Sequence, residues 1–143
     1  MGPDPGIPLE QQPAPAIERM NLYAEARGEG PLGMLAVWHV VANRAARRDT
    51  TRAEEIMRPL QFSWTRPSDP NYRAALNGYK ADPVLWGICD AICSLAEAGY
   101  TIDPTGGALN YYAPLLCSPA WGRGHEKWRE TAVIGRHVFG VAG

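Results

Sequence analysis

The sequence predicts an α+β fold in which a helical body is followed by a small β element late in the chain. Apolar residues recur at helical spacing as far as about residue 98. From residue 103 onward the period changes to short β-like stretches that are interrupted by glycine and proline. At 143 residues the chain is large enough for one hydrophobic core, so we expect a single folded domain.

The first half of that domain is predicted to contain two helices. Residues 1–15 are rich in proline and glycine and are expected to form a flexible arm ahead of a domain that spans residues 16–143. A helix from Pro15 to about residue 27 follows, and Gly28 suits its end. The segment 32–48 is apolar nearly all round at its start and basic at its end, which predicts a buried central helix.

Further helices are expected before the β element. Thr51 can cap a short helix over 52–58, and residues 71–78 suit another helical segment. Asp82 and Pro83 open a long helix that runs to Ala98. We expect the core face of that long helix to consist of Val84, Leu85, Ile88, Ile92 and Leu95.

The remainder of the chain has the pattern of turns, loops and strands. Residues 103–114 predict a turn and a short β-like stretch, and residues 113–130 predict a loop. Residues 131–141 are apolar and predict a strand pair that turns at Gly135-Arg136.

Charge and cysteine content exclude several classes of function. The 14 Lys and Arg residues nearly balance the 15 Asp and Glu residues, so we expect neither nucleic acid nor an anionic membrane as a partner. The spacing of Cys89, Cys93 and Cys117 suits neither a disulfide framework nor a zinc site, although a bridge from Cys117 to one of the others stays open. Without metal-ligand spacing among His, Cys and acidic residues, we predict no metal and no cofactor.

Two glutamates near the end of the first helix are the candidates for acid–base chemistry. Glu25 is either a solvated surface residue or a cleft residue whose pKa is raised by apolar walls and by a second carboxylate at i+4. A carboxylic acid that is still protonated near neutral pH can protonate a leaving oxygen. Glu29 is either a local helper at the start of the next helix or an ion-pair partner of Arg27.

Four pieces of sequence carry a resemblance to a known family. In chain order they are AEARGE at 24–29 before an apolar helix that ends in Asn43-Arg44, QFSW at 61–64, DPTGGAL at 103–109 with Tyr111-Tyr112, and IGRHVF at 134–139. This order resembles the SleB/CwlJ-type cell-wall hydrolases, which include spore-cortex lytic enzymes and phage endolysins. The likeness covers roughly residues 17–140. The family's last piece is similar to IGNHxF, so Arg136 is a departure.

The resemblance implies a lysozyme-like fold, related to lytic transglycosylases and resuscitation-promoting factors. It also implies cleavage of peptidoglycan between N-acetylmuramic acid and N-acetylglucosamine, with Glu25 as the catalytic acid and no metal. A usual hydrolase needs a second carboxylate across the scissile bond, whereas Glu29 would lie beside Glu25 on one helix. A lytic transglycosylase avoids that need, and this is the reaction we expect.

Several residues are expected to bind the glycan. Gln61, Ser63 and Trp64 suit hydrogen bonding and stacking, although Trp64 is equally compatible with core packing. Thr105-Gly106 suits a turn that approaches the sugar, or a loop role only. Tyr111 and Tyr112 alternate in a strand, so one should be buried and one should face the cleft, with Tyr112 the weaker choice for the cleft.

The expected biological role is that of an antimicrobial bacteriophage endolysin that lyses the host. The N-terminus lacks the basic start and apolar stretch of a Sec signal, and no window is apolar enough to span a membrane. We therefore expect a monomer that is made in the host cytoplasm and acts on peptidoglycan after the membrane opens. The alternatives are a virion-associated lysin, a bacterial wall-remodelling enzyme, or a non-catalytic glycan-binding or structural protein.

Overall fold

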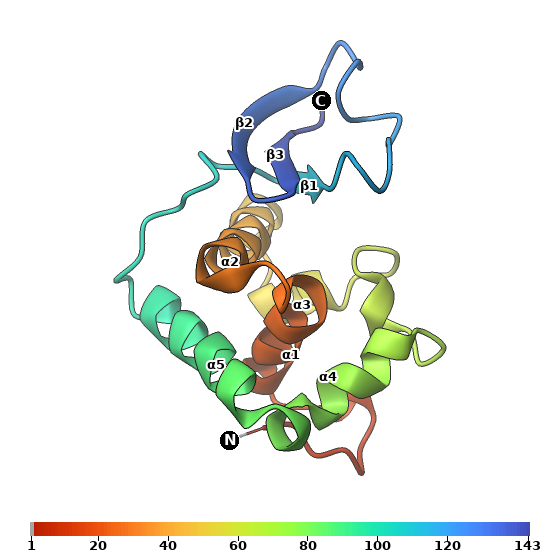
Figure 1. Ribbon diagram of the computed structural model, residues 1–143, viewed down its shortest axis with the longest axis vertical. Coiled ribbons are helices and arrows are strands. Elements are labelled where there is room, and N and C mark those ends of the chain that lie inside the picture. Colours follow the sequence, from red (N-terminus) through yellow and green to blue (C-terminus); the bar gives the residue numbers. More distant parts are fainter. Residues whose placement is uncertain (1) are drawn as a thin grey trace.

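The computed structural model describes residues 2–143 and confirms the α+β architecture (Figure 1). A body of helices carries a small sheet at one end. The helices are α1 Ala14–Ala26, α2 Gly30–Arg48, α3 Arg52–Ile56, α4 Pro70–Ala81 and α5 Pro83–Glu97. The strands are β1 Asn110–Tyr112, β2 Arg129–Ile134 and β3 His137–Val141, and short 3-10 turns lie at Leu9–Gln11 and Ser63–Thr65.

Helix α2 lies between two apolar clusters, which explains why it is apolar nearly all round. Met34, Val37 and Val41 pack into the main core against α1 and α5. Ala36 and Val40, on another side of the helix, pack against a second cluster that contains Phe139 of β3 and Ala108. The prediction of a buried central helix at this position is confirmed, and the sheet is attached to the body through it.

The helix starts follow the signals in the sequence. A proline occupies one of the first two positions of α1, α2, α4 and α5. The Asp82 carboxylate accepts a hydrogen bond from the Leu85 backbone N–H at the start of α5. Thr51 and Glu54 form a reciprocal capping box at the start of α3.

The predicted core face of α5 is partly wrong. Val84 is 77% exposed and Leu95 is 51% exposed. The fully buried residues of this helix are Trp86, Cys89, Cys93 and Ala96. Because both stripes keep helical spacing in an apolar helix, the period alone did not decide which stripe faces the core.

The N-terminal segment lies against the helical body. Leu9 is 1% exposed and belongs to the main core, and the Gln12 side chain bonds the backbone of Asp4 and Ile7. The flexibility expected for residues 1–15 stays a prediction, but this segment is not an extended chain that stands away from the domain.

The sheet confirms the predicted strand pair at the end of the chain. Its order is β1-β3-β2, and both pairings are antiparallel. Strands β2 and β3 turn at Gly135-Arg136, where Gly135 has φ +57°. This positive φ suits glycine at the first position of a two-residue hairpin loop.

The segment before β1 is held by polar side chains of α2. The Asn43 amide donates to Asp103 Oδ2 at 2.9 Å and to the Ala108 carbonyl at 3.0 Å. The Arg44 Nε donates to the Leu109 carbonyl. Asp103 also accepts from the Thr105 backbone and hydroxyl, so the turn is hydrogen-bonded on several sides. These bonds fix where β1 leaves the helical body.

All three cysteines are free thiols. Cys89 and Cys93 are buried in α5, and burial raises the pKa of the Cys89 thiol to about 11. Cys117 is exposed. Across residues 2–143, every helix is too short or too polar to cross a membrane.

The Asn43 bonds predict a measurable loss of stability on substitution. We expect Asn43→Ala to lower the free energy of unfolding by about 1–3 kcal/mol, because Asp103 Oδ2 and the Ala108 carbonyl each lose a donor. Urea denaturation measures the change. Asn77→Ala is the control, since the Asn77 amide bonds only the Arg73 backbone of its own helix. Equal losses of stability from the two substitutions would contradict the proposed role of Asn43 in holding the segment before β1.

Candidate active site

Glu25 lies in the last turn of α1, half-buried, and faces β1. The Tyr111 hydroxyl donates a hydrogen bond of 2.6 Å to Glu25 Oε1. Burial raises the pKa of the Glu25 carboxyl above its ordinary value, and the charge of Asp69 acts in the same direction. The Tyr111 hydrogen bond and the positive charge of Arg44 oppose that rise without cancelling it. Glu25 therefore keeps its proton to a higher pH than an exposed glutamate.

Glu25 opens onto a cavity of about 310 Å³ between the helical body and the sheet. The cavity is lined by Glu25, Arg44, Leu60, Gln61, Phe62, Asn110, Tyr111 and Trp121. Among the described residues, Glu25 supplies the only carboxyl group of this lining. The site thus offers one proton donor, two amide side chains, a guanidinium group and aromatic surface.

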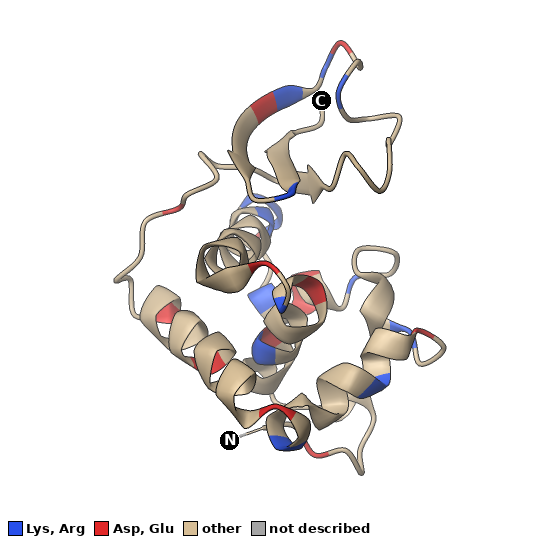
Figure 2. Cartoon of the chain, viewed as in Figure 1, with Lys and Arg blue, Asp and Glu red and all other residues tan. Residues whose placement is uncertain are grey.

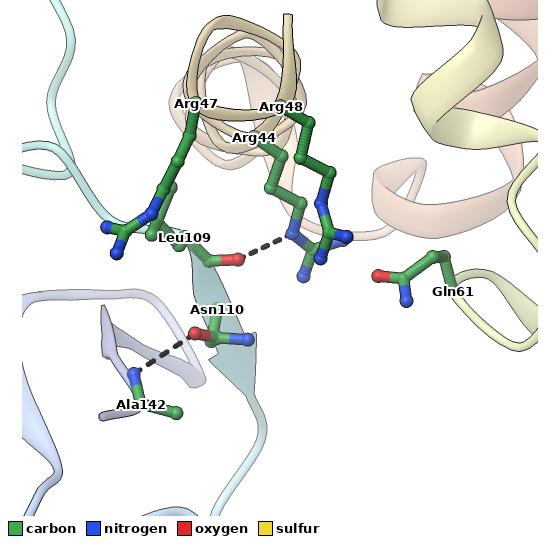
Figure 3. Close-up of a pocket in the computed structure, with 7 residues that line it drawn as sticks. All are labelled: Arg44, Arg47, Arg48, Gln61, Leu109, Asn110 and Ala142. Carbon is green, nitrogen blue, oxygen red and sulfur yellow. Dashed lines mark hydrogen bonds between the residues drawn. The ribbon is translucent and has the colours of Figure 1, made fainter. Parts of the chain in front are cut away.

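A second cavity, of about 490 Å³, continues this space along the end of α2 (Figure 3). Arg44, Gln61 and Asn110 line both cavities, so the two form one groove. Arg47 and Arg48 add to the lining of the second cavity. We call the whole space the Glu25 groove. The groove therefore continues beyond Glu25 along the end of α2, where a bound chain could extend.

Glu29 has a different environment from Glu25. Its Oε2 lies 2.7 Å from Arg136 Nη2, and its Oε1 lies 2.6 Å from His137 Nδ1. The hydrogen bond from Arg136 lowers the pKa of the Glu29 carboxyl. Glu29 therefore joins the start of α2 to the β2–β3 turn as an ionised group. Its contacts with Arg136 and His137 suit a structural role.

Comparison with known families identifies the chain. A sequence model described as Cell Wall Hydrolase matches residues 28–140. The chain belongs to the cell wall hydrolase family. This membership makes it a peptidoglycan-cleaving enzyme. The match begins three residues after Glu25, so the role of Glu25 rests on its geometry and on the resemblance of the AEARGE segment.

A solved structure agrees with this assignment at the level of the fold. The catalytic domain of the germination-specific lytic transglycosylase SleB from Bacillus anthracis superposes with a TM-score of 0.66. The two are 23% identical over 90% of this chain and 93% of that chain. A comparison with curated protein sequences gives no match.

In this cell wall hydrolase, the two tyrosines of β1 alternate as predicted, and the one at the groove is Tyr111 rather than Tyr112, which was the weaker choice. Tyr111 bonds Glu25 and lines the groove. Tyr112 is buried on the opposite side, where it packs against Trp121 and Trp128 and its hydroxyl accepts from the Arg123 backbone. The strand alternation was correct, but it carries no information about which face meets the cleft.

Trp64 does not provide a stacking face for a sugar. It is 0% exposed, and its indole N–H donates to Asn21 at 2.8 Å inside the core. Of the two roles that the sequence left open for Trp64, the structure shows core packing. The tryptophan that lines the groove is Trp121, which is 38% exposed and comes from the loop before β2. Its position in a loop between glycine and proline breakers hid it from pattern analysis.

The remaining predicted residues divide into one that lines the groove and several that do not. Gln61 lines both cavities. Ser63 is exposed and lines neither cavity. Thr105 is buried, and its hydroxyl bonds Asp103 and the Ala108 backbone within the turn that also contains Gly106. Thr105-Gly106 therefore fits the loop role that was left open.

The pairing of Arg27 with Glu29 was wrong. The Arg27 guanidinium instead donates to the backbone carbonyls of Tyr23 and Ala24 and to Asn71 Oδ1 at 2.7 Å. These bonds cover the C-terminal end of α1 and connect it to α4. Helix α1 ends before Arg27, so the side chain folds back over its own helix rather than forward to Glu29.

Besides Trp121, the sequence patterns did not single out several other lining residues, among them Arg44, Asn110 and Leu60. Arg44 was quoted only as part of the Asn43-Arg44 pair at the end of the apolar helix, yet its side chain lines the groove. Asn110 directly precedes Tyr111 and could have been found from that neighbour. Leu60 carried no signal: it is 88% exposed at the groove and has φ +67°, a conformation that costs energy for a residue with a side chain.

The raised pKa of Glu25 predicts how stability depends on pH. Near pH 3 the group is largely protonated in both the folded and the unfolded chain. As pH rises, the unfolded chain releases this proton before the folded chain does, so Glu25 increasingly destabilises the fold. We expect the stability of Glu25→Gln relative to wild type to grow between pH 4 and pH 7. Urea denaturation across that range tests it, and a gap that is constant with pH would contradict it.

Proposed function

We propose that this protein is a lytic transglycosylase that cuts the glycan strand between N-acetylmuramic acid and N-acetylglucosamine. One observation supports it above all: a carboxyl group whose pKa is raised by burial faces a groove whose lining at that point contains no second carboxyl among residues 2–143. A double-displacement or water-activating hydrolase needs two such groups across the bond. With one acid at hand, the nucleophile is best supplied by the substrate itself.

The reaction then uses Glu25 first as an acid and then as a base. Tyr111 occupies Oε1 as a hydrogen-bond donor, which leaves Oε2 to carry the proton. Oε2 protonates the leaving 4-oxygen of N-acetylglucosamine as the bond from that oxygen to C1 of the muramic residue breaks. The resulting carboxylate accepts the proton of the muramic C6 hydroxyl as its oxygen bonds to C1. A 1,6-anhydro end forms, and Glu25 regains its proton.

The groove suits a sugar polymer in other respects. Gln61 and Asn110 present amide groups that can donate to and accept from hydroxyl and acetamido groups. Trp121 offers a partly exposed aromatic face, and Leu60 adds an apolar edge. These residues supply the binding energy that holds the muramic ring with C1 near Glu25.

The biological setting that we propose is host lysis by a bacteriophage endolysin. The resemblance of the four sequence motifs to a family with phage members supports it. In this setting the protein is made in the host cytoplasm, works as a monomer and meets peptidoglycan only after the membrane opens.

The two glutamates should differ sharply in activity assays. We expect Glu25→Gln to lower the initial rate of turbidity loss on purified sacculi by about 10²- to 10⁴-fold, because the amide cannot donate the proton. Glu29→Gln is the matched control, and we expect its rate to stay within about tenfold of wild type, since Glu29 is engaged with Arg136 and His137. A dead Glu29→Gln beside an active Glu25→Gln would mean that the wrong carboxylate was chosen.

The chemical nature of the products separates transglycosylase from hydrolase. We expect mass spectrometry of the released fragments to show 1,6-anhydro-muramic ends, because the substrate's own hydroxyl replaces water as the nucleophile. Reducing ends in their place would overturn the transglycosylase mechanism while leaving cleavage itself intact.

The proposed setting predicts that lysis depends on membrane opening. When the protein is expressed in the bacterial cytoplasm, culture turbidity should remain steady and should fall within minutes of chloroform addition. Cells that express Glu25→Gln should not clear after chloroform. Clearing before chloroform would argue against an enzyme that waits in the cytoplasm.

A further inference from the structure

The second cavity of the Glu25 groove is strongly basic. Arg44, Arg47 and Arg48 line it from the last turns of α2, and Gln61 and Asn110 lie across from them (Figure 3). Its lining contains three arginines and, among the described residues, no acidic side chain. Basic residues gather at this end of α2, next to the sheet (Figure 2). A cavity of about 490 Å³ with this lining is preorganised for an anion.

The positive charge of this cavity is not balanced by its surroundings. Glu25 and Glu55 are the acidic neighbours of Arg44. Burial raises the pKa of Glu25, and Glu55 is shared, since its Oε1 lies 3.3 Å from Arg48 Nε and 3.7 Å from Arg58 Nε. Arg44 donates its Nε only to a backbone carbonyl, and its buried Nη1 has no hydrogen-bond partner among the described residues. A buried guanidinium without an ionised partner is costly, and a bound anion would offset that cost.

We propose that this cavity binds a carboxylate of the peptide stem carried by the strand being cut, a proposal that rests on the proposed function. Arg44, Gln61 and Asn110 line both cavities, so a group held here belongs to the same polymer that lies over Glu25. The acetylated sugars of that polymer are neutral, whereas the stem on the neighbouring lactyl group carries free carboxylates. The planar guanidinium fork matches a carboxylate in two parallel hydrogen bonds.

A simpler role for these arginines needs no ligand. Cations in the last turn of a helix stabilise it through the helix dipole. That role would account for the presence of Arg47 and Arg48 at the end of α2. A role in the helix dipole alone would not make binding depend on the charge of a ligand. Comparing the affinities of a charged ligand and a neutral ligand therefore separates the two roles.

Arg47 is the residue to change. Its side chain is exposed at the cavity beside Leu109, so substitution leaves the buried contacts intact. Arg48 is less suitable, because it contacts the fully buried carboxylate of Glu55 and its loss would threaten folding. Arg73→Glu provides a matched charge reversal on the exposed surface of α4, away from the groove.

The test measures binding of two probes to the full chain carrying Glu25→Gln, which prevents turnover. One probe is a peptidoglycan tetrasaccharide with tripeptide stems, and the other is the same molecule with its stem carboxylates amidated. We expect calorimetry to give a Kd about 10- to 100-fold lower for the free-carboxylate probe. Adding Arg47→Glu should abolish or reverse that preference, whereas adding Arg73→Glu should retain it. Thermal melting confirms that each variant is folded.

The outcomes distinguish the subsite from the proposed reaction. If the chain carrying only Glu25→Gln binds both probes with equal Kd values, the carboxylate subsite is overturned. A preference for the free-carboxylate probe that survives the addition of Arg47→Glu would overturn it as well. If teichoic acid displaces the probe while amidation of the stems leaves its Kd unchanged, the carboxylate subsite is also overturned. The cavity would then be assigned to phosphate binding. A charge preference alongside a wild-type protein that cleaves no sacculi would uphold the subsite and reject the lytic function.

Discussion

The hydrogen bond from Tyr111 to Glu25 is the interaction on which the site depends, because it joins two parts of the molecule that lie 86 residues apart. Glu25 belongs to the helical body, and Tyr111 belongs to the sheet. Their meeting requires the sheet to be held in one place, which Asn43 and Arg44 of α2 achieve by binding the segment before β1. The Glu29–Arg136 ion pair holds the β2–β3 turn near the start of α2. The sheet is thus positioned at both ends of one helix.

The same arrangement places energetic costs at the groove. Burial raises the pKa of Glu25 and lowers the pKa of Arg44, so both groups are less stable in their charged forms than they would be in water. Leu60 adds a left-handed backbone conformation at the same cavity. Costs of this kind persist only where the surrounding packing determines the structure. Here the main core and the second cluster on α2 provide that packing. The shifted pKa values of Glu25 and Arg44 and the backbone conformation of Leu60 all occur at the groove, where a polymer would bind and a proton would be transferred.

Local sequence signals predicted the elements well but did not predict which faces meet. The central helix, the capped starts at Thr51 and Asp82, and the final strand pair were read correctly, because propensity, capping and period act over a few residues. The core stripe of α5 was partly wrong, since a helical period does not say which face of the helix meets the core. The alternation of Tyr111 and Tyr112 was read correctly, but the pattern alone did not settle which of them faces the groove. Trp64 is buried and Trp121 lines the groove for a related reason: the burial of a loop tryptophan depends on tertiary contacts that no window of sequence contains.

The spacing of Glu25 and Glu29 illustrates this limit and also supports a single-acid reaction. Four residues apart in a continuous helix, two carboxylates would share a face and raise each other's pKa. Helix α1 ends at Ala26, however, and Glu29 stands at the cap of α2. The break turns Glu29 toward Arg136, whose hydrogen bond lowers the pKa of Glu29, while burial raises the pKa of Glu25. The second carboxylate is therefore removed from the groove by backbone geometry. An attacking group positioned by this protein must then come from the substrate or from a water that Glu25 itself activates, and the intramolecular C6 hydroxyl requires no further side chain.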